Sequence, residues 1–285
     1  MQWGQAVALV ALGLFAGGYG TMVGLGGGFL LVPAFLFMHY DPRVAAGTSM
    51  AVVLANAASG SASYLRQRRA DVRTALTFAV AGIPGAWLGA LIDQVLPLRL
   101  FSILLAALLA WIGVRLLTTG AHSRDKLESA AVRDDEPRPG LSSEDQERFL
   151  SRDFVDSEGV RHTYRYNLAA GVALSFASGF VASTFGIGGG LVLVPAMVYV
   201  FGFPAHVATA TSHLIIAITA FFGTASHALY GDVLWGPAWL VGIGAVVGAQ
   251  IGARLAKLVP AAPLMRLLAI GVLVTAAKLT WDALT

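Results

Sequence analysis

Two glycine-rich segments that interrupt long apolar stretches carry the clearest chemistry in this sequence. Residues 24–28 read Gly-Leu-Gly-Gly-Gly, and residues 186–190 read Gly-Ile-Gly-Gly-Gly. Each glycine destabilises a helix by about 1 kcal/mol, so we expect the helix to break at both segments. A helix that restarts there directs unpaired N–H groups and a positive dipole end at its N-terminus, which suits an anion. The alternative is that the glycines only allow close helix packing. The candidate binding residues are Gly26, Gly27, Gly28, Gly188, Gly189 and Gly190.

Hydroxyl and amide side chains lie shortly after each glycine segment. The pairs Thr48-Ser49 and Thr211-Ser212 stand near the start of the next apolar block. Hydroxyls there can cap a helix or bind an oxyanion, so all four are candidate substrate ligands. Asn56 lies in the middle of an apolar block and needs a hydrogen-bond partner. We predict either a ligand role for Asn56 or a bond between helices.

Titratable side chains are scarce within the apolar blocks. Aspartates stand only at block ends or in loops, namely Asp41, Asp71, Asp93, Asp232 and Asp282. We therefore expect no buried carboxylate that binds sodium or carries protons. His213 follows Ser212 directly and can titrate near neutrality, so it is the preferred proton-coupling candidate, with a structural histidine as the alternative. His227 lies near a block end and ranks below it.

Composition places these residues in a membrane protein. The 285 residues are 56% hydrophobic and 12% charged, with a mean hydropathy of +0.71. Soluble domains carry roughly 25% charged residues. The apolar blocks cover about residues 4–38, 44–64, 73–92, 99–119, 167–201, 207–229, 236–256 and 263–284. The first and fifth exceed one straight span of a bilayer core of about 30 Å, so each must bend, break or turn back.

Composition also argues against several other functions. The chain has no cysteine, which rules out disulfides and thiolate metal sites, and we expect no cofactor and no metal. The net charge of +3 does not indicate nucleic-acid binding, because the basic residues lie in short loops and one linker without interleaved aromatic residues. Met1 leads almost directly into an apolar run, so we expect a retained membrane segment rather than a cleaved signal peptide.

The two halves of the sequence repeat the same landmarks in the same order. After each glycine segment come a Val-Pro-Ala triplet, a hydroxyl pair, an Asp-Val pair, a Gly-x-x-x-Gly spacing and a proline. Chance does not produce such an order, so the chain contains an internal duplication. We expect an all-α integral membrane protein with a first membrane repeat at residues 1–119, a hydrophilic linker at 120–166 and a second repeat at 167–285.

The linker holds most of the acidic residues and lacks long apolar runs. Its composition predicts a solvated tether, with a regulatory or partner-binding role as the alternative. Within it, residues 142–150 could form a short capped amphipathic helix.

Basic residues predict the orientation. Arg66, Arg68, Arg69 and Arg73 lie between the second and third blocks, which places that loop in the cytoplasm. The equivalent loop of the second half has no basic residue, and Arg254 and Lys257 instead lie in the loop before Pro260. A charge bias that changes loops between halves is typical of inverted repeats. We expect a cytoplasmic linker and both termini outside, with re-entrant hairpins and paired short spans both left open.

The paired motif G-x-G-G-G-x-x-x-V-P, followed in each half by a Thr-Ser pair, resembles the TauE/SafE family of membrane proteins. The resemblance covers residues 4–119 and 167–284 and leaves out the linker. It implies export or permeation of sulfite, sulfoacetate or related organosulfonates in a bacterial or archaeal inner membrane.

Three functions compete on this basis. The first is an alternating-access transporter whose partners are a small anion and the lipid bilayer. The second is a passive anion channel. The third is an intramembrane hydrolase that would use Ser59 with His213 or His227, although a nucleophile-elbow motif is missing. We expect the transporter, and we expect the protein not to be an enzyme.

Overall fold

The computed structural model describes residues 3–119, 149–155, 161–256 and 272–281, and it is almost entirely helical within them. The first half contains α1 (Trp3–Val23), α2 (Gly28–Phe37), α3 (Pro42–Arg66), α4 (Val72–Val95) and α5 (Leu98–Thr119). The second half contains α8 (Leu168–Phe185), α9 (Gly190–Tyr199), α10 (Ala205–Tyr230), α11 (Trp235–Leu255) and a final helix, Val272–Trp281. The expected all-α membrane architecture is confirmed, because six of these helices are long and apolar enough to cross a bilayer.

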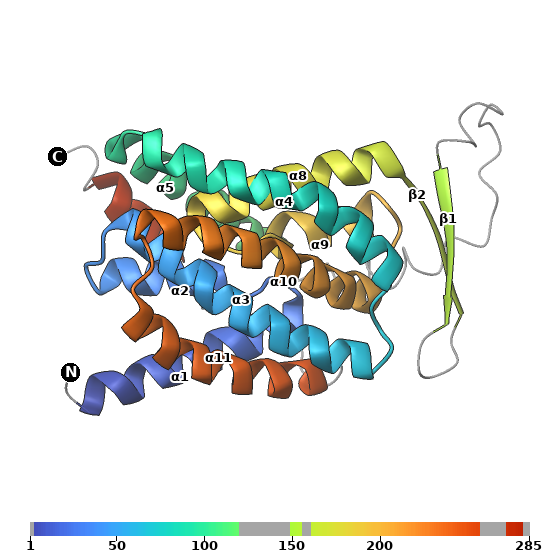
Figure 1. The fold of residues 1–285 in the computed structure, drawn as a ribbon, viewed down its shortest axis with the longest axis horizontal. Helices are drawn as coiled ribbons and strands as arrows, with labels where there is room; N and C mark the ends of the chain where they lie inside the picture. Colours follow the sequence, from blue (N-terminus) through green and yellow to red (C-terminus); the bar gives the residue numbers. More distant parts are fainter. Residues whose placement is uncertain (1–2, 120–148, 156–160, 257–271, 282–285) are drawn as a thin grey trace.

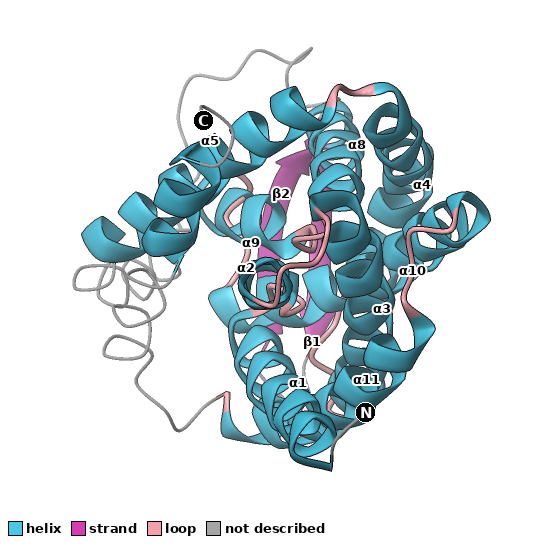
Figure 2. Ribbon diagram, turned by 90° about the vertical axis from the view of Figure 1, so that its left-hand side faces the viewer, coloured by secondary structure: helices cyan, strands magenta, loops and turns pink. Residues whose placement is uncertain are grey.

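The helices form one bundle with α3 and α10 at its centre. In the most apolar window of each of these two helices, 67% of the residues are buried, against 39% for α1 and 44% for α4. The outer helices turn large apolar side chains outward, such as Val80 and Trp239, as expected for surfaces that face lipid. Figure 2 looks along the bundle, and the short helices α2 and α9 lie near its middle.

The two halves exchange their first helices. Helix α1 packs along α11 of the second half, and α8 packs along α4 of the first half. A Cβ atom added at Gly85 would overlap the backbone of α8 at Phe176, and one added at Gly248 would overlap the backbone of α1 at Leu14. The Gly-x-x-x-Gly landmarks of the sequence therefore serve close helix contact between the halves.

Helices α3 and α10, which hold equivalent places in the two halves, run in opposite directions. Helix α3 ends at Arg66, at the end of the bundle that carries two β-strands, and α10 begins at that same end (Figure 1). We call this the hairpin end. The opposite end carries Asp41, Asp93 and Asp232, and we call it the far end; α3 begins there and α10 finishes there.

The strands belong to the segment that the sequence predicted to be a linker. Strand β1 (Phe149–Val155) pairs antiparallel with β2 (Arg161–Asn167), and Tyr164 and Tyr166 of β2 are buried against aromatic residues of the second half. The expected solvated tether is therefore wrong for these residues. The expected helix over residues 142–150 is wrong at its last two positions, which lie in β1, and residues 142–148 lie outside the described residues.

Candidate functional site

Both glycine segments separate two helices and use backbone conformations that favour glycine. Helix α1 ends at Val23 and α2 begins at Gly28; between them Gly24, Gly26 and Gly27 have φ values of 81°, 82° and 83°. Helix α8 likewise ends before Gly186, which has a φ of 68°. Side chains other than hydrogen are strained in this left-handed region, so the sequence at these turns is constrained by geometry.

The two segments lie directly against each other. A Cβ atom at Gly28 would overlap the carbonyl oxygen of Gly186, and one at Gly190 would overlap the carbonyl oxygen of Gly24. A Cβ atom at Gly188 would lie 2.7 Å from the carbonyl oxygen of Leu25. The N-terminal ends of α2 and α9 therefore meet, and backbone atoms fill the space between them.

One serine from each half holds the glycine segment of the other half. The Ser49 hydroxyl donates to the Gly186 carbonyl at 2.7 Å, and the Ser212 hydroxyl donates to the Gly24 carbonyl at 3.0 Å. Both serines are fully buried. The predicted serine candidates thus lie at the glycine segments, where their oxygen atoms contact backbone.

The neighbouring threonines point elsewhere. The Thr48 hydroxyl accepts from the backbone N–H of Leu234, and the Thr211 hydroxyl accepts from the backbone N–H of Asp71, both at 3.0 Å. These contacts fix the loops before α11 and α4. The structure therefore brings the serines, and not the hydroxyls of the threonines, to the glycine segments.

Asn56 and His213 belong to a polar chain beside the first glycine segment. Asn56 donates to the Gly26 carbonyl at 3.0 Å and accepts from the Thr21 hydroxyl at 3.1 Å. Because Thr21 donates its hydrogen to Asn56, its oxygen accepts from His213 Nε2, which lies 3.1 Å away. Tyr64 donates to the Thr21 carbonyl at 2.8 Å. Sequence reasoning missed Thr21 and Tyr64, although Thr21 stands three residues before the glycine segment.

Several buried polar atoms near these helices have no hydrogen-bond partner among the described residues. They are His213 Nδ1, the hydroxyls of Tyr19, Ser61, Ser183, Thr224 and Ser226, Arg43 Nε and both carboxylate oxygens of Asp93. Buried polar groups in proteins are almost always paired, so such atoms need an explanation. His213 Nδ1 is an acceptor in the tautomer that its contact with Thr21 requires, and it remains available to a protonated or polar ligand.

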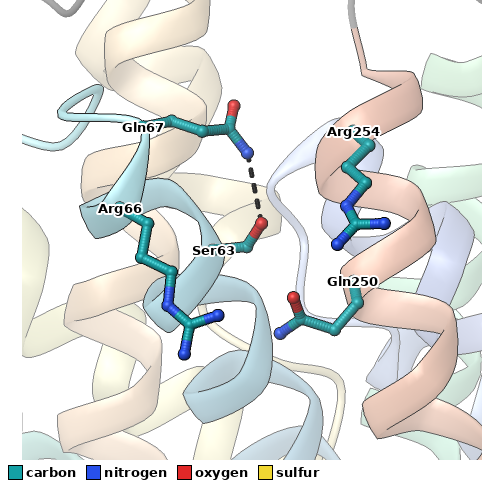
Figure 3. A pocket seen from close by; sticks show the side chains of 5 residues that line it. All are labelled: Ser63, Arg66, Gln67, Gln250 and Arg254. Carbon is teal, nitrogen blue, oxygen red and sulfur yellow. Dashed lines mark hydrogen bonds between the residues drawn. The ribbon is translucent and has the colours of Figure 1, made fainter.

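A polar pocket of about 410 Å³ opens at the hairpin end between α3 and α11 (Figure 3). Ser63 and Arg66 line it from α3 and Gln67 from the residue after that helix, and Gln250 and Arg254 line it from α11. Gln67 donates to the hydroxyl of Ser63 at 3.1 Å. Two guanidinium groups on facing helices raise the local concentration of anions. In the sequence these arginines indicated only orientation.

A buried carboxylate at the far end corrects one expectation. Asp93 is fully buried, with Oδ1 3.6 Å from Arg43 Nε and Oδ2 3.9 Å from His227 Nδ1. His227 Nδ1 also lies 3.4 Å from Asp232 Oδ2. The prediction that no buried carboxylate exists is wrong, because the ends of α3 and α10 close over a residue that lies only one turn from the end of α4.

Possible ligand atoms of Asp93, His227 and Asp232 lie within 4.8 Å of one another. One imidazole and two carboxylates are a usual set of ligands for a metal cation. The adjacent guanidinium of Arg43 opposes a divalent cation there. Within the described residues, no other cluster of this kind was found.

Comparisons with known proteins agree with this architecture. The family described as "Sulfite exporter TauE/SafE" matches residues 9–279. A probable membrane transporter protein, YunE of Bacillus subtilis, is 29% identical and aligns over 98% of both chains. A probable membrane transporter protein of Haemophilus influenzae is 26% identical over 81% of this chain and 77% of its own. No solved structure matches. The two relatives named here are each described as a probable membrane transporter protein. The chain therefore belongs to the sulfite exporter TauE/SafE family.

Proposed function

We propose that the protein exports a small anion across the inner membrane, with sulfite or an organosulfonate such as sulfoacetate as substrate. The family description names sulfite, and the relatives carry the name of membrane transporters. The anion binds near mid-membrane at the N-terminal ends of α2 and α9. The ligands proposed are the glycines of both segments, the hydroxyls beside them, Asn56 and His213.

The observation that carries this proposal is the meeting of two helix N-termini between the central helices. Glycines at the start of α2 and α9 let an anion approach backbone N–H groups, and both helix dipoles favour negative charge at that point. No carboxylate of the described residues contacts the glycine segments. Because the two segments touch in this structure, the anion enters when they separate, as in alternating access.

The course of the chain supports inverted repeats with re-entrant hairpins. Helix α9 returns to the hairpin end, where Phe201 packs against Tyr166 of β2 and α8 begins. Helix α2 returns to the far end, where Phe37 meets Lys278 of the final helix. In Figure 1, α1 also begins at the far end. Each half therefore dips into the bundle from its own side, which is the pattern of an inverted duplication.

Charge supports an orientation with the hairpin end in the cytoplasm. Arg66 and Arg254 line the pocket at that end, and aspartates gather at the far end. Short cytoplasmic loops carry an excess of basic residues. The arginine pocket then collects anions inside the cell, and a negative interior favours their exit by about 2.3 kcal/mol per charge per 100 mV.

A hydrolase receives no support from the geometry. The Ser59 hydroxyl donates to the Val246 carbonyl at 2.9 Å, and Gln250 lies beside it. His213 contacts Thr21, and His227 contacts Ser183. Neither histidine forms a hydrogen bond with Ser59, so a nucleophile and its base are not brought together at this serine.

The experiment that tests the proposal is counterflow of labelled sulfite in proteoliposomes that contain the purified protein. We expect saturable uptake, competed by sulfoacetate and not by short carboxylates. Single-channel currents in planar bilayers would instead favour a passive channel. Absence of both sulfite uptake and competition by any sulfonate would rule out the proposed substrates.

A further inference from the structure

We propose that Asp93, His227 and Asp232 form a proton-binding site at the far end, which couples proton movement to anion movement. The site lies apart from the glycine segments and differs from the histidine that the sequence favoured, His213. Its coupling role rests on the proposed transport function, whereas its capacity to bind a proton does not.

The contacts of His227 fix where its hydrogens lie. Nε2 is 2.8 Å from the carbonyl oxygen of Ser183, which can only accept, so Nε2 carries a hydrogen. In a neutral ring Nδ1 then has a lone pair. Yet Nδ1 lies 3.4 Å from Asp232 Oδ2, also an acceptor when ionised. A stable contact between these two atoms requires a proton between them, on the ring or on the carboxyl group.

Asp93, which also faces Nδ1 of His227, favours a proton at the same place. Both of its carboxylate oxygens are buried without a hydrogen-bond partner, and Oδ2 points at His227 Nδ1 from 3.9 Å. Arg43 approaches Oδ1 through Nε, but its guanidinium donates to the carbonyl of Leu96. An ionised carboxylate without hydrogen bonds is costly in a buried setting. A positive charge on the imidazole of His227 offsets that cost.

The balance of charge favours one proton over a divalent cation. Two carboxylates and one guanidinium leave a single negative charge around a neutral imidazole, and one proton on Nδ1 neutralises it. Gln94 donates to Asp232, and among the described residues the exposed Asp41 at the start of α3 adds a further negative charge near Asp93. Asp232 retains 12% side-chain exposure, so a proton from solution can reach the site.

The bond from His227 to Ser183 connects this site to the centre of the protein. Ser183 lies in the last turn of α8, three residues before Gly186, whose carbonyl accepts from Ser49. A proton on His227 strengthens its attraction to the two carboxylates. This change occurs at a side chain that is bonded to α8 within one helical turn of the second glycine segment. We infer that the proton taken up from the far side stabilises one arrangement of that segment.

The direct test is a nuclear magnetic resonance titration of the full-length protein with isotope-labelled histidine, without substrate. We expect the signal of one imidazole to change with pH. Its signal disappears in His227→Tyr, a variant that keeps a donor toward Ser183, as Tyr64 does toward Thr21. In Asp93→Asn, which removes one of the carboxylates beside the ring, the midpoint of this change shifts. The matched control, Asp71→Asn, leaves the midpoint in place.

Two results of the titration overturn the site. One is a His227 signal that does not change with pH or does not respond to Asp93→Asn. The other is a signal that follows the sodium concentration, against choline as control, instead of pH.

Proteoliposomes test the coupling. A pH difference should drive sulfite movement by the wild-type protein and by Asp71→Asn, and the drive should fall at least tenfold in His227→Tyr. If the rate of sulfite movement does not depend on the pH difference, the proposed coupling is wrong. Complete absence of sulfite movement contradicts the proposed function, and the titration still decides the site.

Discussion

Asp71 and Asp232 occupy equivalent places in the two halves, but their carboxylates have different partners. Asp71 accepts from two backbone N–H groups at the start of α4, from the hydroxyl of Thr74 at 2.6 Å and from the hydroxyl of Tyr164 at 2.5 Å. Asp232 caps no helix and faces His227 and Gln94. The same aspartate is therefore a structural cap in one half and part of a titratable cluster in the other.

The residues one helix away show the same divergence. Tyr64 donates to the Thr21 carbonyl in the first half, and His227 takes the equivalent position toward Ser183 in the second, both at 2.8 Å. Duplication preserved the bond while the side chain changed from a phenol to an imidazole. The comparison teaches that the repeat keeps the geometry of a contact while the chemistry of the side chain that makes it changes.

The largest expected effect tests whether the helix exchange is truly equivalent in both halves. Gly85→Val and Gly248→Val each force a side chain into the backbone of a helix from the other half. Overpacking against backbone cannot relax, so we expect both variants to lose folded protein at least tenfold, measured by size-exclusion chromatography in detergent. Gly236→Ala is the control, because nothing lies within 4 Å of its added atom. A normal yield of one variant and not the other would show that the α4–α8 and α1–α11 contacts are not equivalent.

The next effect separates the two aspartates. Asp71→Ala removes a helix cap and two charge-assisted hydrogen bonds, so we expect the free energy of unfolding to fall by about 2–4 kcal/mol. Asp232→Ala removes no cap, and we expect a loss of about 1 kcal/mol or a small gain, because a carboxylate beside Asp93 disappears. Thermal unfolding of the two variants measures the difference. Equal losses would mean that Asp232 is as structural as Asp71.

A smaller effect concerns the crossed serines. Ser49→Ala and Ser212→Ala each leave one buried glycine carbonyl without its serine donor, so each should lower the free energy of unfolding by about 1–2 kcal/mol. If the two halves are equivalent here, the losses agree within about 0.5 kcal/mol in thermal unfolding. Ser59→Ala, at a half-buried position away from the glycine segments, serves as the control. A loss confined to one serine would show that the glycine segments are held unequally.

The smallest effect concerns the arginine pocket, which has no counterpart at the far end, because the residue equivalent to Arg66 is Leu229. Arg66→Gln and Arg254→Gln should raise the KM for sulfite about 3- to 10-fold with little change in kcat, since they remove attraction rather than ligands. The increase should shrink at high salt. A KM that is unchanged at low salt would remove the pocket from the path of the anion.

The sequence predicted most of the architecture because a duplication leaves its landmarks in both copies. The membrane class follows from composition, and the family follows from the paired glycine motif. The burial of Asp93 could not be foreseen, since it depends on how the ends of α3 and α10 close over the end of α4. The equivalence of Tyr64 and His227 was hidden because the two side chains differ in type while making the same bond.

The β-hairpin escaped prediction for another physical reason. Its strands carry four charged residues, Arg152, Asp153, Arg161 and Arg165, within a segment rich in charge, so composition outweighed the pattern of the two tyrosines. The candidate site residues were also predicted only in part. Positions of the glycines and serines follow from the motif, but the direction in which the Thr48 and Thr211 hydroxyls point depends on loops of the other half.

The exchange of first helices has a consequence for movement. Helix α8 is joined to α4 along its length, and the hairpin that leads into α8 is bonded to Asp71 at the start of α4. Helices α1 and α11 form the matching pair. Each of these two packed pairs is therefore made of helices from both repeats. Opening by the proposed alternating access would separate helices that follow one another in the chain, and not one repeat from the other.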